Sequence, residues 1–305
     1  MSGLPTSPPV PPRTDGPAGG APPSNGDGPA AGGGARSASD VRGPGGSADP
    51  ELAAAAHTIV RFARDECPLS PAEDRWLRTG LASALPDLRM NALFDIRPGL
   101  LRESQHLVVG VERASGTPVS ALGASWATTA SGRPFLHIGI QFVAAELRGG
   151  QAFATSWLAL LEEVAATGGF PYLAALRTYN PVAYCAMRAY GRLPGAAMYP
   201  AIGTASGDPD AQVVALAGEI AAALAPGAPF DPASGGIAGI GVPRDLYRVR
   251  PQGDDAEVNA HFERHAEPGD RILCMVRIPE ETVDAIMANF TRRTRKPARS
   301  SAARG

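Results

Sequence analysis

The sequence has few cysteines, few aromatic residues and no long apolar run. Its three cysteines, Cys67, Cys185 and Cys274, lie far apart in a chain of 305 residues. A disulfide framework or a zinc site is therefore not expected, and a reducing compartment fits. No apolar segment approaches the roughly 18 residues of a membrane span. The amino terminus lacks the basic and apolar regions of a signal peptide. We therefore expect a cytoplasmic protein that does not enter a membrane.

The chain also lacks an excess of charge of either sign. Its formal net charge is -2 at pH 7, from 28 Lys and Arg and 30 Asp and Glu. This balance gives no general reason to expect nucleic acid or an acidic membrane surface as a partner. The length is sufficient to bury a sizeable core. Small molecules and other proteins remain as the expected ligands.

Composition divides the chain into a tail and a folded part. The first 48 residues are rich in Pro, Gly, Ala and Ser and contain no aromatic residue. Such a segment cannot bury enough apolar surface to offset the entropy that ordering would cost. We therefore predict a disordered tail at 1–48, one domain at 49–290 and a short basic disordered tail at 291–305.

Two helices are expected at the start of the domain. The Asp-Pro pair at 49–50 combines an N-cap residue with Pro at the first helical position, and predicts a helix to about residue 66. Ser70 and Glu73 form a capping box, which predicts a second helix to about Leu85.

Strand and helix patterns alternate through the rest of the domain. Apolar runs bounded by Gly-containing turns predict an antiparallel meander, and helical periodicity follows it. The predicted strands are 107–111, 118–128, 135–143, 172–176, 197–202 and 271–278, and the predicted helices are 150–167, 181–190, 208–224, 254–262 and 279–290. The fold class is therefore α/β, with a mixed, mostly antiparallel sheet flanked by helices.

Two motifs in this region are candidates for function. In the first, Arg148 precedes a Gly-Gly turn that opens a helix. Such a turn leaves backbone N–H groups at the positive end of the helix dipole, where a diphosphate binds well. In the second, Asn180 begins the sequence Asn-Pro-Val-Ala at the start of the next helix. Asn180 could cap that helix or donate to a ligand.

These motifs resemble those of the GNAT superfamily of acyl-CoA-dependent N-acyltransferases. Segment 143–153 looks like the family's pyrophosphate loop, and 180–184 is similar to its Asn-x-x-Ala helix beside pantetheine. The resemblance covers about 100 residues. It implies acetyl-CoA or another acyl-CoA as co-substrate, an amine of a small molecule or protein as acceptor, and no metal. The residues implied to bind the co-substrate are Phe142, Val143, Arg148, Gly149, Gly150, Gln151, Ala152, Phe153 and Asn180.

The resemblance also bears on the order of elements. In the family the last two strands form a hairpin, which here would pair 197–202 with 271–278. The core would then comprise about 105–202 and 270–279. A helical insertion at about 203–269 would separate its two parts and could cover the substrate.

Three residues are candidates for catalysis. His137 lies on a predicted strand and has an unperturbed pKa suited to proton transfer at neutral pH, although a packed or surface histidine is the alternative. Glu146 precedes the turn and could instead favour the helix start. Tyr184 lies on the Asn180 helix, where core packing is the alternative. Many family members have a proton-donating Tyr seven residues after the Asn, but that position holds Met187.

Departures from the family leave other functions open. Gln151 and Phe153 stand where the loop pattern has small residues that let the backbone approach a diphosphate. A degenerate, inactive acyl-CoA-binding sensor or interaction module is one alternative, and a structural protein that binds a partner is another. His261 and His265 have the spacing of a metal pair, but no third ligand is identifiable. The sequence identifies neither the acceptor nor the oligomeric state.

Overall fold

The computed structural model describes residues 57–63, 69–148, 151–191, 195–203, 210–279, 283–284, 286–288 and 292. The predicted tail at 1–48 lies outside these residues, as does the tail at 291–305 except for Arg292. The boundaries of the predicted domain therefore stay predictions. A closing helix is predicted at 279–290. The structure describes residues 283–284 and 286–288 of this segment as helical.

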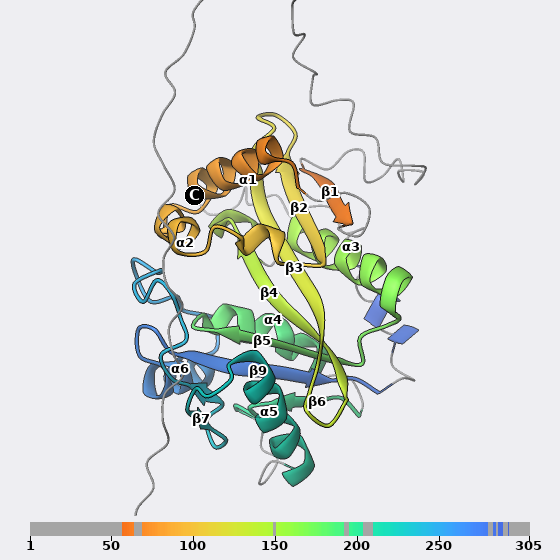
Figure 1. Ribbon diagram of the computed structural model, residues 1–305, viewed down its shortest axis with the longest axis vertical. Helices are drawn as coiled ribbons and strands as arrows, with labels where there is room; N and C mark the ends of the chain where they lie inside the picture. Colours follow the sequence, from red (N-terminus) through yellow and green to blue (C-terminus); the bar gives the residue numbers. More distant parts are fainter. Residues whose placement is uncertain are drawn as a thin grey trace, which may run out of the picture. The chain divides into compact units, whose positions relative to one another are not determined.

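A mixed sheet of nine strands forms the centre of the described structure (Figure 1). The strands are β1 (His57–Ala63), β2 (His106–Glu112), β3 (Pro118–Thr128), β4 (Pro134–Val143), β5 (Leu173–Thr178), β6 (Ala197–Tyr199), β7 (Phe230–Asp231), β8 (Gly236–Ile237) and β9 (Arg271–Arg277). Their order is β1-β2-β3-β4-β5-β9-β8-β7, and β6 also pairs with β9. The pairs within this order are antiparallel except for β4 with β5. The predicted fold class is therefore confirmed.

Helices cover both faces of the sheet. They are α1 (Pro71–Ala84), α2 (Met90–Ile96), α3 (Gln151–Gly168), α4 (Pro181–Gly191), α5 (Ala211–Leu224) and α6 (Ala256–His265), with single 3-10 turns at Leu100–Arg102 and Ala145–Leu147. Figure 1 shows α1, α2 and α5 in front of the sheet and α3 and α4 behind it. The helices pack in three apolar clusters: one holds α1 and α2, one holds α5, and one holds α3, α4 and α6. A fully buried Leu or Phe in such a cluster contributes about 1.5–3 kcal/mol.

Local signals predicted several of these elements well. The capping box of α1 is present, because Ser70 Oγ accepts from the N–H of Glu73 at 3.2 Å and Glu73 Oε2 accepts from the N–H of Ser70 at 2.8 Å. The meander, α3 and α4 lie where periodicity places them. The expected pairing of 197–202 with 271–278 is confirmed for β6, whose Met198 faces Val276.

The first predicted helix is wrong where the structure describes it. Residues 57–63 form β1, which pairs antiparallel with β2 from His57 opposite Glu112 to Ala63 opposite His106. The β-branched run at 58–60 favours a strand, and the open edge of β2 supplies hydrogen-bond partners. This long-range pairing decides the conformation. The Asp-Pro signal lies outside the described residues.

The insertion between β6 and β9 differs in detail from the prediction. The N-cap of α5 is Asp210 and that of α6 is Asp255, two residues and one residue later than predicted. Segment 226–242, for which no strand is predicted, contains β7 and β8, which extend the sheet beyond β9. Two-residue strands are too short to produce a periodic signal.

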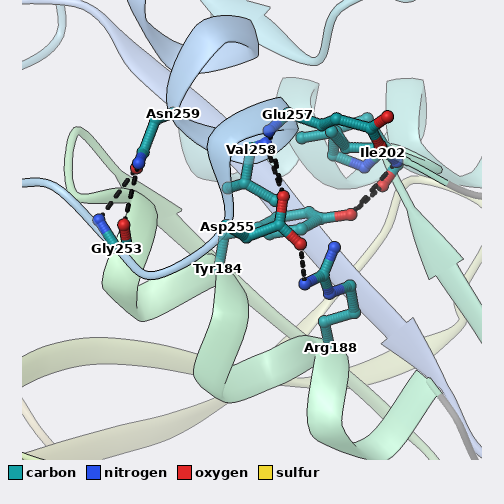
Figure 2. Close-up of polar contacts among 9 residues, drawn as sticks. Tyr184, Arg188, Ile202, Gly253, Asp255, Glu257, Val258 and Asn259 are labelled. Carbon is teal, nitrogen blue, oxygen red and sulfur yellow. Dashed lines mark hydrogen bonds and ion pairs between the residues drawn. The ribbon is translucent and has the colours of Figure 1, made fainter.

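Polar contacts fix α6 of the insertion to α4 of the core (Figure 2). Arg188 of α4 forms an ion pair with Asp255. The same carboxylate caps α6 by accepting from the N–H groups of Glu257 and Val258 at 3.0 and 3.1 Å. One acidic residue thus joins the two helices and satisfies the first turn of one of them.

Candidate functional site

Strands β4 and β5 run parallel but pair over a short stretch only. Their register joins 136–137 with 174–175. Beyond this stretch β4 continues to Val143 beside β3, and β5 continues to Thr178 beside β9. Among the described residues, each of the two strands therefore has a backbone edge without a strand partner along its carboxyl-terminal half. The backbone groups on these two edges are available to pair with a thin, extended ligand, and we call the space between them the slot.

The free edge of β4 carries hydrogen-bonding groups. The N–H of Ala144 donates to the carbonyl of Val119 at 2.9 Å, on the side of β3. Because N–H groups alternate between the two sides of a strand, those of Val143 and Gln141 point toward β5. The Oε1 atom of Gln141 is buried and has no hydrogen-bond partner among the described residues. Phe142 contributes its side chain to the cluster under α1 and α2 instead.

The turn between β4 and α3 holds Arg148 at a fixed position. Its Nε donates to the carbonyl of Val143 at 3.2 Å, and its Nη2 pairs with Asp87 Oδ2 at 2.8 Å. Phe153, in the first turn of α3, packs edge-to-face with Trp157, with 6.3 Å between the two ring centres. Predicted groups outside the described part of the chain are Gly149, Gly150 and the side chains of Glu146, Gln151 and Ala152.

Asn180 acts at the end of β5 both as a helix cap and as a hydrogen-bonding side chain. Its Oδ1 accepts from the N–H of Val182 at 2.9 Å and so caps α4. Its side chain also acts on the hydroxyl of Tyr247, whose pKa it lowers against the larger effect of burial. Its own N–H donates to Thr178 Oγ1 at 2.9 Å. Asn180 is therefore fixed at the end of β5, next to Tyr247.

A segment of the insertion crosses this space. We call residues 241–250 the strap. Its backbone forms a short antiparallel bridge with the connection between α1 and α2. In this bridge the N–H of Arg89 donates to the carbonyl of Leu246 at 2.8 Å, and the N–H of Arg248 donates to the carbonyl of Asp87 at 3.1 Å. The connection at 87–89 also holds Arg148, so the strap lies close to the turn before α3.

Both ends of the strap are anchored. At the first end the N–H of Gly241 donates to the carbonyl of Gly269 at 2.7 Å. At the other, Arg250 donates to the hydroxyl of Tyr179 at 2.8 Å and to the carbonyl of Phe262 at 2.9 Å. Its guanidinium also lies 4.6 Å from the centre of the Tyr179 ring. The middle of the strap therefore spans two fixed points.

Tyr247 fills the gap beneath the strap. Its side chain packs against the apolar clusters on both faces of the sheet. Its ring centre lies 5.7 Å from that of Tyr179, and burial raises the pKa of its hydroxyl. It lies between Asn180, after β5, and the Arg148–Asp87 pair, after β4. Sequence reasoning missed this residue because no local signal indicates where an insertion loop docks.

His137 lies where β4 and β5 begin to separate. Burial lowers its pKa to about 4, and the positive charges of Arg177 and Arg97 act in the same direction. These surroundings make His137 a weaker base than a histidine with the unperturbed pKa. The imidazole is neutral at pH 7, so it is able to accept a proton but is a weak base in this state.

Tyr184 is held as a structural residue. It is fully buried, and its hydroxyl donates to the carbonyl of Pro200 at 2.7 Å and accepts from the N–H of Ile202 at 3.2 Å (Figure 2). Burial raises its pKa to about 12. These contacts favour the packing alternative over a catalytic role. Met187 on the same helix is also buried, in the same cluster.

Removing the Tyr184 hydroxyl should destabilise the fold without slowing the chemistry. Tyr184→Phe leaves a buried carbonyl and a buried N–H without their partner, which should lower the free energy of unfolding by about 1–3 kcal/mol. Denaturant unfolding measures this loss. Thr58→Val, which removes a hydroxyl at an exposed position on β1, is the control and should change the free energy of unfolding little. Lost activity at unchanged stability would instead assign catalysis to Tyr184.

The described residues contain no group of three or more His, Cys, Asp or Glu side chains that could hold a metal ion. The rings of His261 and His265 are 4.7 Å apart, but Nε2 of His261 lies 2.9 Å from the carbonyl of Ser234. In the same part of the chain no helix is both long and apolar enough to cross a membrane.

The chain is similar to solved structures of GNAT-family acetyltransferases. One, from Brucella melitensis in complex with acetyl-CoA, is 10% identical, with 39% of this chain and 75% of that chain covered and a TM-score of 0.29. Another, from Staphylococcus aureus, is 10% identical, with 46% and 84% covered and a TM-score of 0.29. Escherichia coli ElaA is 13% identical, with 50% and 94% covered and a TM-score of 0.35. No protein-family model and no curated protein matches the chain.

Proposed function

We propose that this chain transfers an acetyl or other acyl group from acyl-CoA to an amine of a small molecule or a protein. The observation that carries the proposal is the parallel pair β4 and β5, which separates after 136–137 beside a turn that opens an 18-residue helix. A ligand extended along the separated strands would end at the start of this helix, where backbone N–H groups favour an anion. The resemblance of the two sequence motifs to the GNAT superfamily supports the same conclusion.

The groups around the slot fit the parts of acyl-CoA. The N–H groups of Val143 and Gln141 and the orphaned Oε1 of Gln141 match the amides of a pantetheine arm. Arg148 and the first turn of α3 would hold the diphosphate. Asn180 would donate to the arm through its side-chain amide. The bound acyl-CoA would supply an activated thioester.

The proposed reaction is a direct attack on that thioester. The amine nitrogen forms a bond to the carbonyl carbon, and the carbon–sulfur bond breaks. His137 is the candidate to accept the proton that the amine loses, because its imidazole is neutral at pH 7. Met187 has no proton to donate. The departing thiolate would therefore take its proton from water, which a thiol pKa near 8.5 permits.

The strap favours a second candidate function. With Tyr247 docked, the slot is occupied by the chain's own residue. A chain that keeps the strap closed would serve as an interaction module or, where the strap yields without turnover, as an acyl-CoA sensor. Measuring both binding of acetyl-CoA and release of free CoA in the presence of amines distinguishes the two functions, because a sensor binds without releasing CoA.

Removing the charge of Arg148 should weaken acetyl-CoA binding by about tenfold. The reason is the loss of a cation beside the diphosphate, and the effect should shrink as salt screens it. Calorimetric titration of Arg148→Ala at low and high salt measures both effects. Arg75→Ala, at an exposed position on α1, is the control. Equal affinities for Arg148→Ala and the unaltered protein would remove phosphate binding from this turn.

A further inference from the structure

Two arginines lie on one face of the sheet beside the point where β4 and β5 separate. His137 pairs with Ala175 and so shares its face, and Arg177 follows two residues later on β5. Arg177 in turn faces Leu273 of β9, and Arg271 lies two residues before Leu273. The side chains of His137, Arg177 and Arg271 therefore belong to the same face, on three neighbouring strands.

Neither arginine has a carboxylate partner in the described part of the chain. Arg177 Nη1 donates to the carbonyl of Leu224, at the end of α5, at 2.6 Å. Arg271 Nη1 donates to the carbonyl of Asp270 at 2.7 Å. The carboxylate of Asp270 accepts from the N–H of Gly239 at 2.8 Å. Both guanidinium groups are half-buried.

This face also has a break in its apolar packing. One cluster lies under α1 and α2 and reaches Ile140 on β4. A separate cluster lies under α5 and reaches Phe135 on the same strand. Between Phe135 and Ile140 on this face lies His137, with Ser125 opposite it on β3. The polar pair Ser125 and His137 thus lies in the break, and Arg177 lies on the same face one small residue, Ala175, away from His137.

Like charges on neighbouring strands of one face repel each other. Here burial lowers the pKa of Arg177, and the charges of Arg97 and Arg271 lower it further. Burial also lowers the pKa of Arg271. Arg97 is itself paired with Glu103. An anion bound between Arg177 and Arg271 would relieve this repulsion, and its charge would make His137 a stronger base.

We propose that Arg177 and Arg271 bind a carboxylate or phosphate group of the acceptor. The acceptor is therefore an amine that also carries an anionic group. Guanidinium groups suit both anions because their planar forks donate pairs of hydrogen bonds. The bound anion would place the amine toward His137 and the start of the slot. The role as acceptor rests on the proposed function, whereas binding of the anion does not.

The binding test needs no turnover. The unfolding midpoint is measured with N-acetylglycine and with N-acetylglycinamide, which lacks the carboxylate. We expect the acid to raise the midpoint of the unaltered protein more than the amide does. Arg177→Gln and Arg271→Gln should each weaken binding of the acid at least tenfold. Arg277→Gln removes one positive charge from the other end of β9, and this variant should still bind the acid as the unaltered protein does. Equal responses of all four proteins would overturn the proposal.

Arg271→Gln guards against a folding defect in Arg177→Gln, because the hydrogen bond described for its side chain goes to a carbonyl of the adjacent residue. Turnover then separates this inference from the proposed function. Turnover is compared within two pairs of amines, glycine with glycinamide and phosphoethanolamine with ethanolamine, and the pair that shows a preference distinguishes carboxylate from phosphate. The unaltered protein should prefer the anionic member of a pair, and this preference should vanish in Arg177→Gln and Arg271→Gln. Equal turnover of the charged and neutral members would reject the anionic acceptor while acyl transfer stands. Selective anion binding without acetyl-CoA binding would reject acyl transfer alone.

Discussion

Tyr247→Ala should tighten the binding of acetyl-CoA by about tenfold or more. If the strap must leave the slot before the ligand enters, the apparent affinity is the intrinsic affinity multiplied by the fraction of molecules that are open. Tyr247 is half-buried, so removal of its ring should weaken the closed state by less than the about 3–5 kcal/mol that a core ring costs, which still increases that fraction. Calorimetric titration of both proteins measures the change. Tyr247→Phe is the matched control, because it keeps the ring and loses only the hydroxyl.

A reversible lock tests the same gate from the other side. Leu88 and Tyr247 face each other in an antiparallel bridge whose hydrogen bonds are made by their neighbours. Such pairs have Cα atoms about 4.5 Å apart, within the range of a disulfide. The double variant Leu88→Cys, Tyr247→Cys should bind acetyl-CoA when reduced and fail to bind when oxidised. Equal binding in both states, with no gain from Tyr247→Ala, would mean that the strap does not gate the slot.

His137→Gln should lower the turnover number by about a hundredfold or more, with a smaller change in KM. The loss follows from removing the group proposed to accept the proton of the amine, while glutamine keeps a polar side chain of similar length. Steady-state kinetics with a saturating amine measures it. His57→Gln, on the distant strand β1, is the control. Turnover equal to that of the unaltered protein would remove His137 from the mechanism.

The pKa of His137 also makes stability depend on pH. Its pKa is about 4 in the folded chain, against an ordinary value of 6.5 for a histidine in an unfolded chain. As pH falls from 6.5 to 4, the unfolded chain binds the proton first, so stability present above pH 6.5 is lost over this interval. The loss should be at most about 3 kcal/mol. It should be absent from His137→Gln in denaturant titrations at about pH 7 and about pH 4.5.

Local sequence determined much of the sheet and its helices. The capping box of α1 and the meander could be predicted because each depends on residues close in sequence. Strand β1 could not, because its conformation depends on pairing with β2, about fifty residues later. The N-caps of α5 and α6 were displaced for a simpler reason: consecutive or nearby Asp residues can each cap a helix, and packing selects one.

The candidate site could be predicted only in part. Asn180 as a helix cap and Arg148 at the turn follow from motifs, although Asp87 as the partner of Arg148 does not. The lowered pKa of His137 could not be predicted, because it depends on burial in the fold and on Arg177 and Arg97, which come from β5 and from the end of α2. Tyr247 reaches the slot only because the strap bridges to 87–89. In each case the missing information is a contact between segments distant in sequence.

The two anchors of the strap have a kinetic consequence. With Gly241 and Arg250 both held, the residues between them must leave the slot together. Entry of the ligand would then follow a unimolecular opening step. At low concentrations of acetyl-CoA the observed association rate would increase in proportion to concentration. At high concentrations it would reach a plateau equal to the opening rate, a limit that a permanently open slot would not have.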